Sequence, residues 1–302
     1  MKLNPNASVI GKENTILSGT ARQYHVADFE GVLSIKTTVL GEAVWSSDGR
    51  IYTVTPGSWL HLNDEQRYSI SIDSATPVTT FCLFFRRGLA GEILDTLRNP
   101  IERSLERPSA MAFNPELRVR LRPRETDVDL LIRRMHALLS MEFDADWDSM
   151  FMKAALYLIQ DEGEIYRTAL SLKAKRLSTR TEVQRRVFRG RDYLLSNLRR
   201  SITTEEAARE ASMAPFHFHR SFHDAFGQTP HGFLRSERMK LARHYCERTS
   251  LPATEICALC GYASLGTFSS TFSAFHHTSF LTLRKKARLK NNRRGGMWRM
   301  EA

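Results

Sequence analysis

The sequence has no run of eighteen apolar residues, and its first residues, M-K-L-N-P-N-A-S, lack the apolar stretch of a secretory signal. It has only four cysteines in 302 residues, which excludes a disulfide-rich scaffold and favours free thiols in a reducing compartment. We therefore expect a cytoplasmic protein without a membrane segment. An apolar fraction of 42% excludes a disordered or fibrous chain, and the length allows two domains with a core each.

Acidic residues are scarce near the C-terminus. Residues 1–180 carry 23 Lys and Arg against 23 Asp and Glu, whereas residues 181–302 carry 21 against 10, so the formal net charge of +11 lies in the C-terminal part. A concentrated positive field attracts polyanions and releases their counterions. Nucleic acid is the leading partner, and a merely soluble basic face is the alternative.

The N-terminal part has the pattern of short strands. Apolar or alternating runs such as V-L-S-I-K-T-T-V-L (32–40) and T-T-F-C-L-F-F (79–85) are separated by turn residues, which predicts a small β-barrel or β-sandwich. From about residue 89 the period becomes helical. One expected apolar stripe comprises Leu130, Leu131, Arg134, Met135, Leu138 and Leu139, and another comprises Phe151, Ala154, Ala155 and Leu158. These helices would either cover the β-domain or pair two copies of the chain.

The C-terminal part contains an internal repeat of helical segments. Thr203-x-x-Glu206 is a capping-box pattern, Gly227 is a helix stop, and a longer helix over about 232–247 joins two similar halves. Phe218-x-Arg220-x-Phe222 in the first half is echoed by Phe268-x-Ser270-x-Phe272 in the second, at an offset of 49 to 50 residues. Each half therefore predicts a helix-turn-helix.

Three histidines, His217, His219 and His223, stand close together in the first half. A helix would place Phe218, Phe222 and Phe226 on one face and the polar residues elsewhere. Zinc is not expected there, because Arg220 stands where a metalloprotease helix has Glu and no third ligand follows. Cys257-x-x-Cys260 likewise predicts small core residues, since the repeat places both cysteines opposite alanines and no second cysteine pair is present.

The segment from Arg185 to about Arg284 resembles the DNA-binding domain of the AraC/XylS family of bacterial transcription regulators. The resemblance rests on I-T-T-E-E-A-A-R-E-A-S-M-A-P-F-H-F-H-R-S-F, F-G-Q-T-P-H-G-F-L-R-S-E-R-M-K-L-A-R and P-A-T-E-I-C-A-L-C-G-Y-A-S-L-G-T-F-S-S-T-F, about a third of the chain. It implies two recognition helices on one face of double-stranded DNA at promoter sites, in major grooves roughly 34 Å apart. The expected DNA-binding residues are Phe216, His217, His219, Arg220 and His223, with Leu265, Gly266, Thr267 and Ser270 in the second half.

The chain departs from the family pattern at several positions, and these departures predict different roles for the two recognition helices. Ser270 stands where the second recognition helix usually has Arg, His277 replaces a closing Gly, and Ala214 replaces a capping Ser. We expect the first helix to make most base contacts, with Arg220 reaching guanine O6 and N7, while the second contacts backbone or senses shape. The basic segment 284–300 either adds phosphate contacts or serves as a solubilising tail.

The N-terminal β-region resembles the cupin-type sensing half of many family members. A small-molecule effector pocket is one interpretation of its aromatic residues and plain core is the other; the candidate lining is Trp45, Tyr52, Trp59, His61, Phe81 and Phe84. Since only His25 and His61 lie in the strand region, we expect no metal, no other cofactor and no catalytic residues.

The sequence thus predicts an α+β multidomain protein with an N-terminal cupin-like β-barrel or sandwich and a C-terminal double helix-turn-helix domain. The expected parts are a sensing domain (1–110), a helical dimerisation or packing segment (111–170), a basic linker (171–184), the DNA-binding domain (185–288) and a basic tail (289–302). The expected function is a transcription regulator, more often an activator in this family, acting as a homodimer with RNA polymerase. A cupin-like enzyme with a basic accessory domain and a non-specific nucleoid-associated protein are the alternatives.

Overall fold

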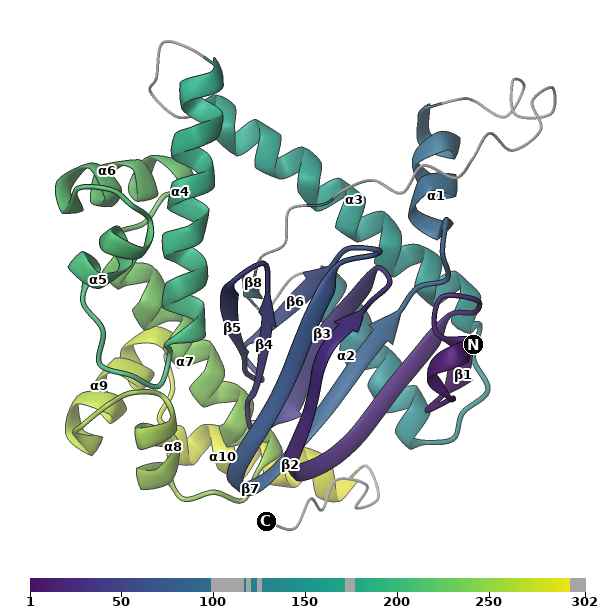
Figure 1. Cartoon of the computed structure of the whole chain (residues 1–302). Helices are drawn as coiled ribbons and strands as arrows, with labels where there is room; N and C mark the ends of the chain where they lie inside the picture. Colours follow the sequence, from purple (N-terminus) through teal and green to yellow (C-terminus); the bar gives the residue numbers. More distant parts are fainter. Residues whose placement is uncertain (99–116, 118–120, 124–126, 172–176, 294–302) are drawn as a thin grey trace. The chain divides into compact units, whose positions relative to one another are not determined.

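The computed structural model describes residues 1–98, 117, 121–123, 127–171 and 177–293 (Figure 1). The chain divides into two compact units, Met1–Leu170 and Ser171–Ala302. Unit 1 is rich in strands, and unit 2 is helical throughout its described part. The predicted fold class, with a sheet-rich N-terminal part followed by a helical C-terminal part, is confirmed. No helix in the part of the chain that the structure describes is long and apolar enough to cross a membrane.

Unit 1 contains eight strands and three α-helices among its described residues. The strands are β1 (Lys2–Leu3), β2 (Thr15–Glu30), β3 (Ser34–Leu40), β4 (Ala43–Ser47), β5 (Arg50–Val54), β6 (Ser58–Leu62), β7 (Arg67–Phe84) and β8 (Leu121–Pro123). The helices are α1 (Leu89–Arg98), α2 (Asp127–Ser140) and α3 (Trp147–Ser171), with a short 3-10 turn at Ala7–Val9.

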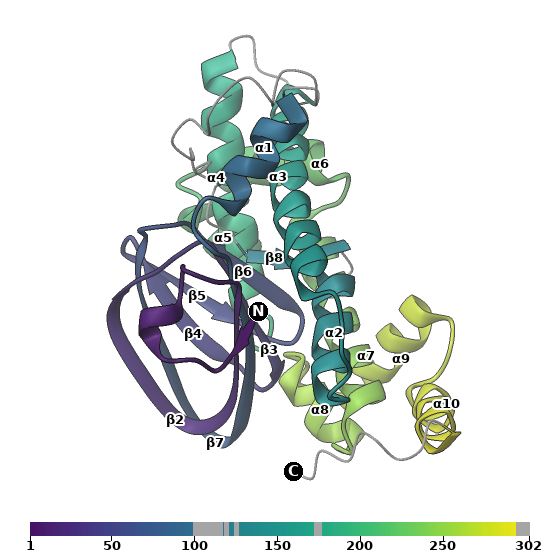
Figure 2. The same ribbon diagram turned by 90° about the vertical axis from the view of Figure 1, so that its right-hand side faces the viewer.

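All described strands belong to one sheet, with the order β1-β2-β7-β3-β6-β8 and with β4 paired to β5 and β7. The long strand β7 pairs along its length with β2, while its second half also pairs with β3 and its first half with β4. Irregular pairing between Ala21 and Gln23 and between Val26 and Phe29 bends this ribbon (Figure 2). Among the described strands, β1 and β8 are open edges, so the sheet does not close into a barrel, which was one of the two predicted forms.

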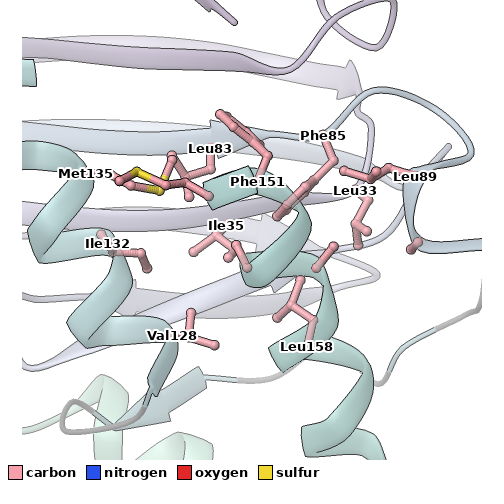
Figure 3. Close-up of a cluster of buried hydrophobic side chains, with 14 of the residues drawn as sticks. Leu33, Ile35, Leu83, Phe85, Leu89, Val128, Ile132, Met135, Phe151 and Leu158 are labelled. Atoms are coloured by element: carbon pink, nitrogen blue, oxygen red, sulfur yellow. The ribbon is translucent and has the colours of Figure 1, made fainter. Parts of the chain in front are cut away.

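Helices α2 and α3 pack on one face of the sheet and bury the main core of unit 1. Ile35 of β3, Leu83 of β7 and Phe85 directly after β7 meet Ile132 of α2 and Phe151 of α3 (Figure 3). The predicted stripe on α3 is confirmed, because its phenylalanine, two alanines and leucine are fully buried. The apolar faces of these helices therefore serve the core of their own unit.

The predicted stripe on α2 is confirmed at Met135 but wrong at Leu130 and Arg134, which are exposed. Val128, Ile132 and Met135 face the core, whereas Leu130 is 60% exposed. Three leucines of the expected stripe pack only at the edge of the core, namely Leu131, Leu138 and Leu139. The apolar residues of α2 span more than half of its circumference, so periodicity alone could not decide which of them face the sheet.

Unit 2 contains seven α-helices among its described residues: α4 (Leu177–Ser196), α5 (Thr204–Glu210), α6 (Pro215–Phe226), α7 (Pro230–Arg248), α8 (Ala253–Leu259), α9 (Leu265–His276) and α10 (Phe280–Arg293). Two boundaries differ from the sequence prediction. The expected linker over 171–184 is helical from Leu177, and the expected tail over 289–302 is helical to Arg293. Ser171 is the last residue of α3, and residues 172–176 and 294–302 lie outside the described residues.

Local signals set the ends of the first helix-turn-helix as predicted. The Thr203 hydroxyl accepts a hydrogen bond from the Glu206 amide at 3.2 Å, and the Glu206 carboxylate accepts one from the Thr203 amide at 2.7 Å. This capping box satisfies two amides that would otherwise have no partner at the start of α5. Pro215 begins α6, and Gly227 ends it with a left-handed φ of 69°.

The repeat is visible in the backbone as well as in the sequence. The turn between α5 and α6 contains Ser212 at φ 53°, and the equivalent turn between α8 and α9 contains Gly261 at φ 71°. His277 ends α9 at φ 52°, in the place that Gly227 takes at the end of α6. The left-handed conformation is less stable by about 1 kcal/mol for a residue that has a Cβ atom, as Ser212 and His277 do. The fold of the repeat therefore imposes this conformation on residues that do not favour it.

Helix α7 runs between the two halves and contributes to both cores. Phe233 packs its ring against Phe222 of the first half at 5.6 Å between centroids, while Met239 lies in the core of the second half. The guanidinium of Arg238 donates to the carbonyl oxygens of Leu198 and Arg200 after α4. These contacts on several sides fix the two halves relative to one another.

The four cysteines are all buried. Cys257 and Cys260 occupy core positions of α8, as Ala208 and Ala211 do around α5, which confirms their assignment as packing residues. Burial raises the pKa of both thiols, so neither is activated as a thiolate.

Candidate nucleic-acid interface

Helix α6 separates its apolar and polar residues onto opposite faces. Phe218 and Phe222 are fully buried, and their rings lie 5.5 Å apart. The five residues expected to bind DNA on this helix are all exposed: Phe216, His217, His219, Arg220 and His223. Phe216, a large apolar residue, is 80% exposed and is therefore available for a contact with a partner molecule.

The Arg220 guanidinium is available to a partner molecule. Among the residues that the structure describes, none forms a hydrogen bond or an ion pair with Arg220. A guanidinium carries five donors in a planar fork, which fits two acceptors on one base edge or one phosphate. The first helix thus presents one fixed cation beside three imidazoles.

No side chain caps the start of this helix. Ala214 occupies the N-cap position without a side-chain hydrogen bond, and Pro215 follows as the first helical residue. At the equivalent place in α9, the Ser264 hydroxyl faces the Thr267 amide at 3.5 Å. The amides at the start of α6 and the exposed side chains beside them therefore lie on the same solvent-facing end of the helix.

Helix α9 offers a chemically different surface. Phe268 and Phe272 are fully buried like their counterparts on α6. The four residues expected to contact DNA here are exposed: Leu265, Gly266, Thr267 and Ser270. The Ser270 hydroxyl donates to the Thr267 carbonyl oxygen at 3.0 Å, so its proton is already used within the helix. Over its twelve residues, L-G-T-F-S-S-T-F-S-A-F-H, α9 has no Lys, Arg, Asp or Glu.

The two recognition helices occupy equivalent places in the repeat. Figure 1 shows α6 and α9 at the same edge of unit 2, with α7 running between them. Each follows a seven-residue helix through a turn containing a left-handed residue. The structure therefore brings the two recognition helices to one edge of a single compact unit.

Positive charge in unit 2 is concentrated beyond the recognition helices. Helix α10 reads F-L-T-L-R-K-K-A-R-L-K-N-N-R, with six cations and no acidic residue. Lys285, Lys286 and Arg288 are exposed. The sequence predicted a tail for part of this charge, whereas the structure places these cations on α10, the helix that follows α9.

The candidate effector residues are all buried, but they do not form one group. Trp59, His61 and Phe81 lie on the helix-covered side of the sheet, where Trp59 and Phe81 belong to the core. Trp45 and Tyr52 oppose one another across the β4–β5 hairpin. Phe84 alternates with the core residues Leu83 and Phe85 and therefore points to the other face.

Comparisons with known proteins agree with this architecture. Residues 207–286 match a family model described as a helix-turn-helix domain. A probable transcriptional regulator, LumQ of Photobacterium leiognathi, is 27% identical over 88 residues, which are 29% of this chain and 36% of that protein. The match thus spans about a third of the length of this curated relative.

Two solved structures are also similar. The C-terminal domain of AraT, a response regulator from Geobacillus stearothermophilus, is 25% identical, with a TM-score of 0.33 over 33% of this chain and 84% of that one. Unsaturated fatty acid-bound ToxT from Vibrio cholerae is 14% identical, with a TM-score of 0.33 over 91% of this chain and 96% of that one. On its sequence motifs and the family match, the C-terminal part of this chain is an AraC-type helix-turn-helix domain.

Proposed function

We propose that this chain is a sequence-specific DNA-binding transcription regulator in which α6 and α9 enter successive major grooves of one duplex. The observation that carries the proposal is the repeated helix-turn-helix, with both recognition helices exposed on one compact, basic unit. Because α7 fixes the spacing of α6 and α9, the two helices together recognise a DNA site made of two short elements.

The two helices divide the work of recognition. Arg220 has no partner in the described chain and donates to guanine O6 and N7, while Phe216 contacts a thymine methyl group. His217, His219 and His223 contact neighbouring bases or phosphates. Helix α9, with its small neutral residues, follows the shape of the groove, and the cations of α10 add phosphate contacts.

The remaining functional assignments follow from this role. The β-rich unit 1 senses an effector or pairs two copies of the chain, and the regulator recruits RNA polymerase as an activator. It has no enzymatic role and needs no metal or other cofactor. A regulator of this kind works where the chromosome is, in the bacterial cytoplasm.

Selection from a random duplex library tests the proposal. The purified full-length chain is incubated with random duplexes at physiological salt, and the bound fragments are sequenced. We expect an asymmetric motif with two short elements about one helical turn apart, the element containing guanine being the more strongly constrained. Equal retention of all sequences, with a salt dependence that accounts for nearly all the affinity, would instead identify a non-specific DNA-binding protein.

A further inference from the structure

Unit 1 contains a fully buried lysine that the regulator function does not use. Lys36 lies on β3 and is 1% exposed. Its neighbour Ile35 faces the core beneath α2 and α3, so the Lys36 side chain points to the opposite face of the sheet. Lysine is almost never fully buried without a charged partner, which makes this position a candidate for chemistry.

Aromatic groups surround the Lys36 ammonium nitrogen. Nζ lies 3.0 Å from the Tyr68 hydroxyl oxygen and 3.6 Å from the centroid of the Phe84 ring. The Tyr68 ring is held in place by Phe29, at 5.6 Å between centroids, and by Gly31, where a Cβ atom would stand 2.6 Å from the tyrosine ring. The hydroxyl and the nitrogen are thus preorganised at hydrogen-bonding distance.

The surroundings favour the neutral amine. Among the described residues, no carboxylate pairs with Lys36, and only the Tyr68 hydroxyl and the faces of the Phe84 and Tyr68 rings contact its nitrogen. Burial outweighs these contacts and lowers the pKa of Lys36 to about 7. The same burial raises the pKa of the Tyr68 phenol and of the nearby Cys82 thiol, so both keep their protons. At neutral pH the site therefore holds a nucleophilic amine beside a protonated phenol.

We propose that Lys36 is a covalent binding site for small aldehydes, which it captures as a reversible imine with Tyr68 as the proton donor. The amine lone pair forms a bond to the carbonyl carbon while the carbonyl π bond breaks, and the oxygen takes the phenolic proton. Nitrogen then returns a proton to Tyr68. In the second step the hydroxyl leaves as water with a proton from Tyr68, the C=N bond forms, and the last nitrogen proton restores the phenol.

The net reaction is amine plus aldehyde to imine plus water, so it needs no oxidant or reductant. Desolvated lysines are the residues that form such adducts with carbonyl compounds. The proposal goes beyond DNA binding, since it assigns a chemical class of ligand to unit 1. It holds or fails independently of whether the chain recognises a particular DNA sequence.

Reductive trapping tests the proposal. The full chain is treated with propanal and cyanoborohydride at pH 7, digested, and analysed by mass spectrometry for propylated lysines. Lys12 is exposed and serves as the internal comparison. At this pH an ordinary lysine is about one part in 3,000 amine, whereas a lysine with a pKa near 7 is about half amine. Allowing for hindered entry of the aldehyde, we expect Lys36 to be modified at least about tenfold more than Lys12.

Two controls separate the site from general reactivity. In denatured protein, Lys36 and Lys12 should react alike, and the Tyr68→Phe variant, with its fold checked by circular dichroism, should trap propanal more slowly at Lys36. Modification of Lys36 no faster than that of Lys12 in the folded wild-type chain would overturn the covalent site. An unchanged rate in Tyr68→Phe would overturn the role of the phenol as proton donor.

Discussion

Replacing Arg220 with alanine should remove discrimination at one base pair of the site without damaging the fold. The guanidinium is exposed and has no hydrogen-bond or ion-pair partner in the described chain, so its loss leaves no buried group unsatisfied. A bidentate contact to guanine is worth about 1–3 kcal/mol of discrimination, which corresponds to about 5- to 150-fold in relative affinity. Ser270→Ala should change affinity less than about twofold, because that hydroxyl already donates to the Thr267 carbonyl oxygen.

Competition binding measures this difference. A fluorescent duplex carrying the selected motif is displaced by unlabelled duplexes in which each base pair is changed in turn, for wild-type protein and for both variants. Arg220→Ala should flatten the preference at one guanine and leave the others intact. Equal losses from Arg220→Ala and Ser270→Ala, or an Arg220→Ala loss that is the same on every duplex, would refute the division of roles between α6 and α9.

Three further substitutions test the packing, the repeat and the basic helix. Gly190→Ala should destabilise unit 2 by about 1–2 kcal/mol, because the new Cβ atom would stand 2.4 Å from the buried Phe218 ring and overpacking outweighs the gain in helix propensity; hydrogen exchange of α6 measures this. His277→Gly should raise the free energy of local opening of α9 by about 1 kcal/mol, which slows its hydrogen exchange, because glycine adopts the left-handed conformation without strain. Lys285→Gln combined with Lys286→Gln should lower the slope of log affinity against log salt by about 2, if each cation neutralises one phosphate.

The packing test and the salt test each have a matched control in the same chain. Gly266→Ala lies on α9, where the nearest atom to the new Cβ is 3.6 Å away, so it should not destabilise unit 2. Lys12→Gln removes an exposed cation of unit 1 and should leave the salt slope unchanged. Destabilisation by Gly266→Ala, faster exchange in His277→Gly, or a salt slope unaffected by the α10 changes would contradict the respective prediction.

The sequence predicted the helical unit well because its determinants are local. Three signals each act within one or two turns of helix: the capping box at Thr203, the helix end at Gly227 and the four-residue spacing of the phenylalanines on α6. Because the segment is repeated, the same signals predict the second helix-turn-helix as well. What the sequence could not indicate is that His277 keeps the left-handed conformation of a glycine, since packing of the whole second half imposes it.

The β-rich unit was harder to predict because its contacts are distant in sequence. Strand β7 pairs with β2, β3 and β4. The residues R-Y-S-I-S-I-D-S at its start do not indicate where the pairing with one strand ends and the pairing with another begins. Lys36 stands in an alternating strand, where a lysine indicates the solvent face. Only the position of Tyr68 and Phe84 above it shows that this face is covered.

Changing the spacing within the selected site tests most directly whether α6 and α9 contact one duplex together. Five base pairs inserted between the two elements of the motif would place the second element on the opposite side of the helix. Because α7 packs into both halves and fixes their separation, affinity should fall to that of a duplex carrying only the first element. Ten inserted base pairs should not restore it. Affinity unchanged by either insertion would contradict recognition by two rigidly linked helices.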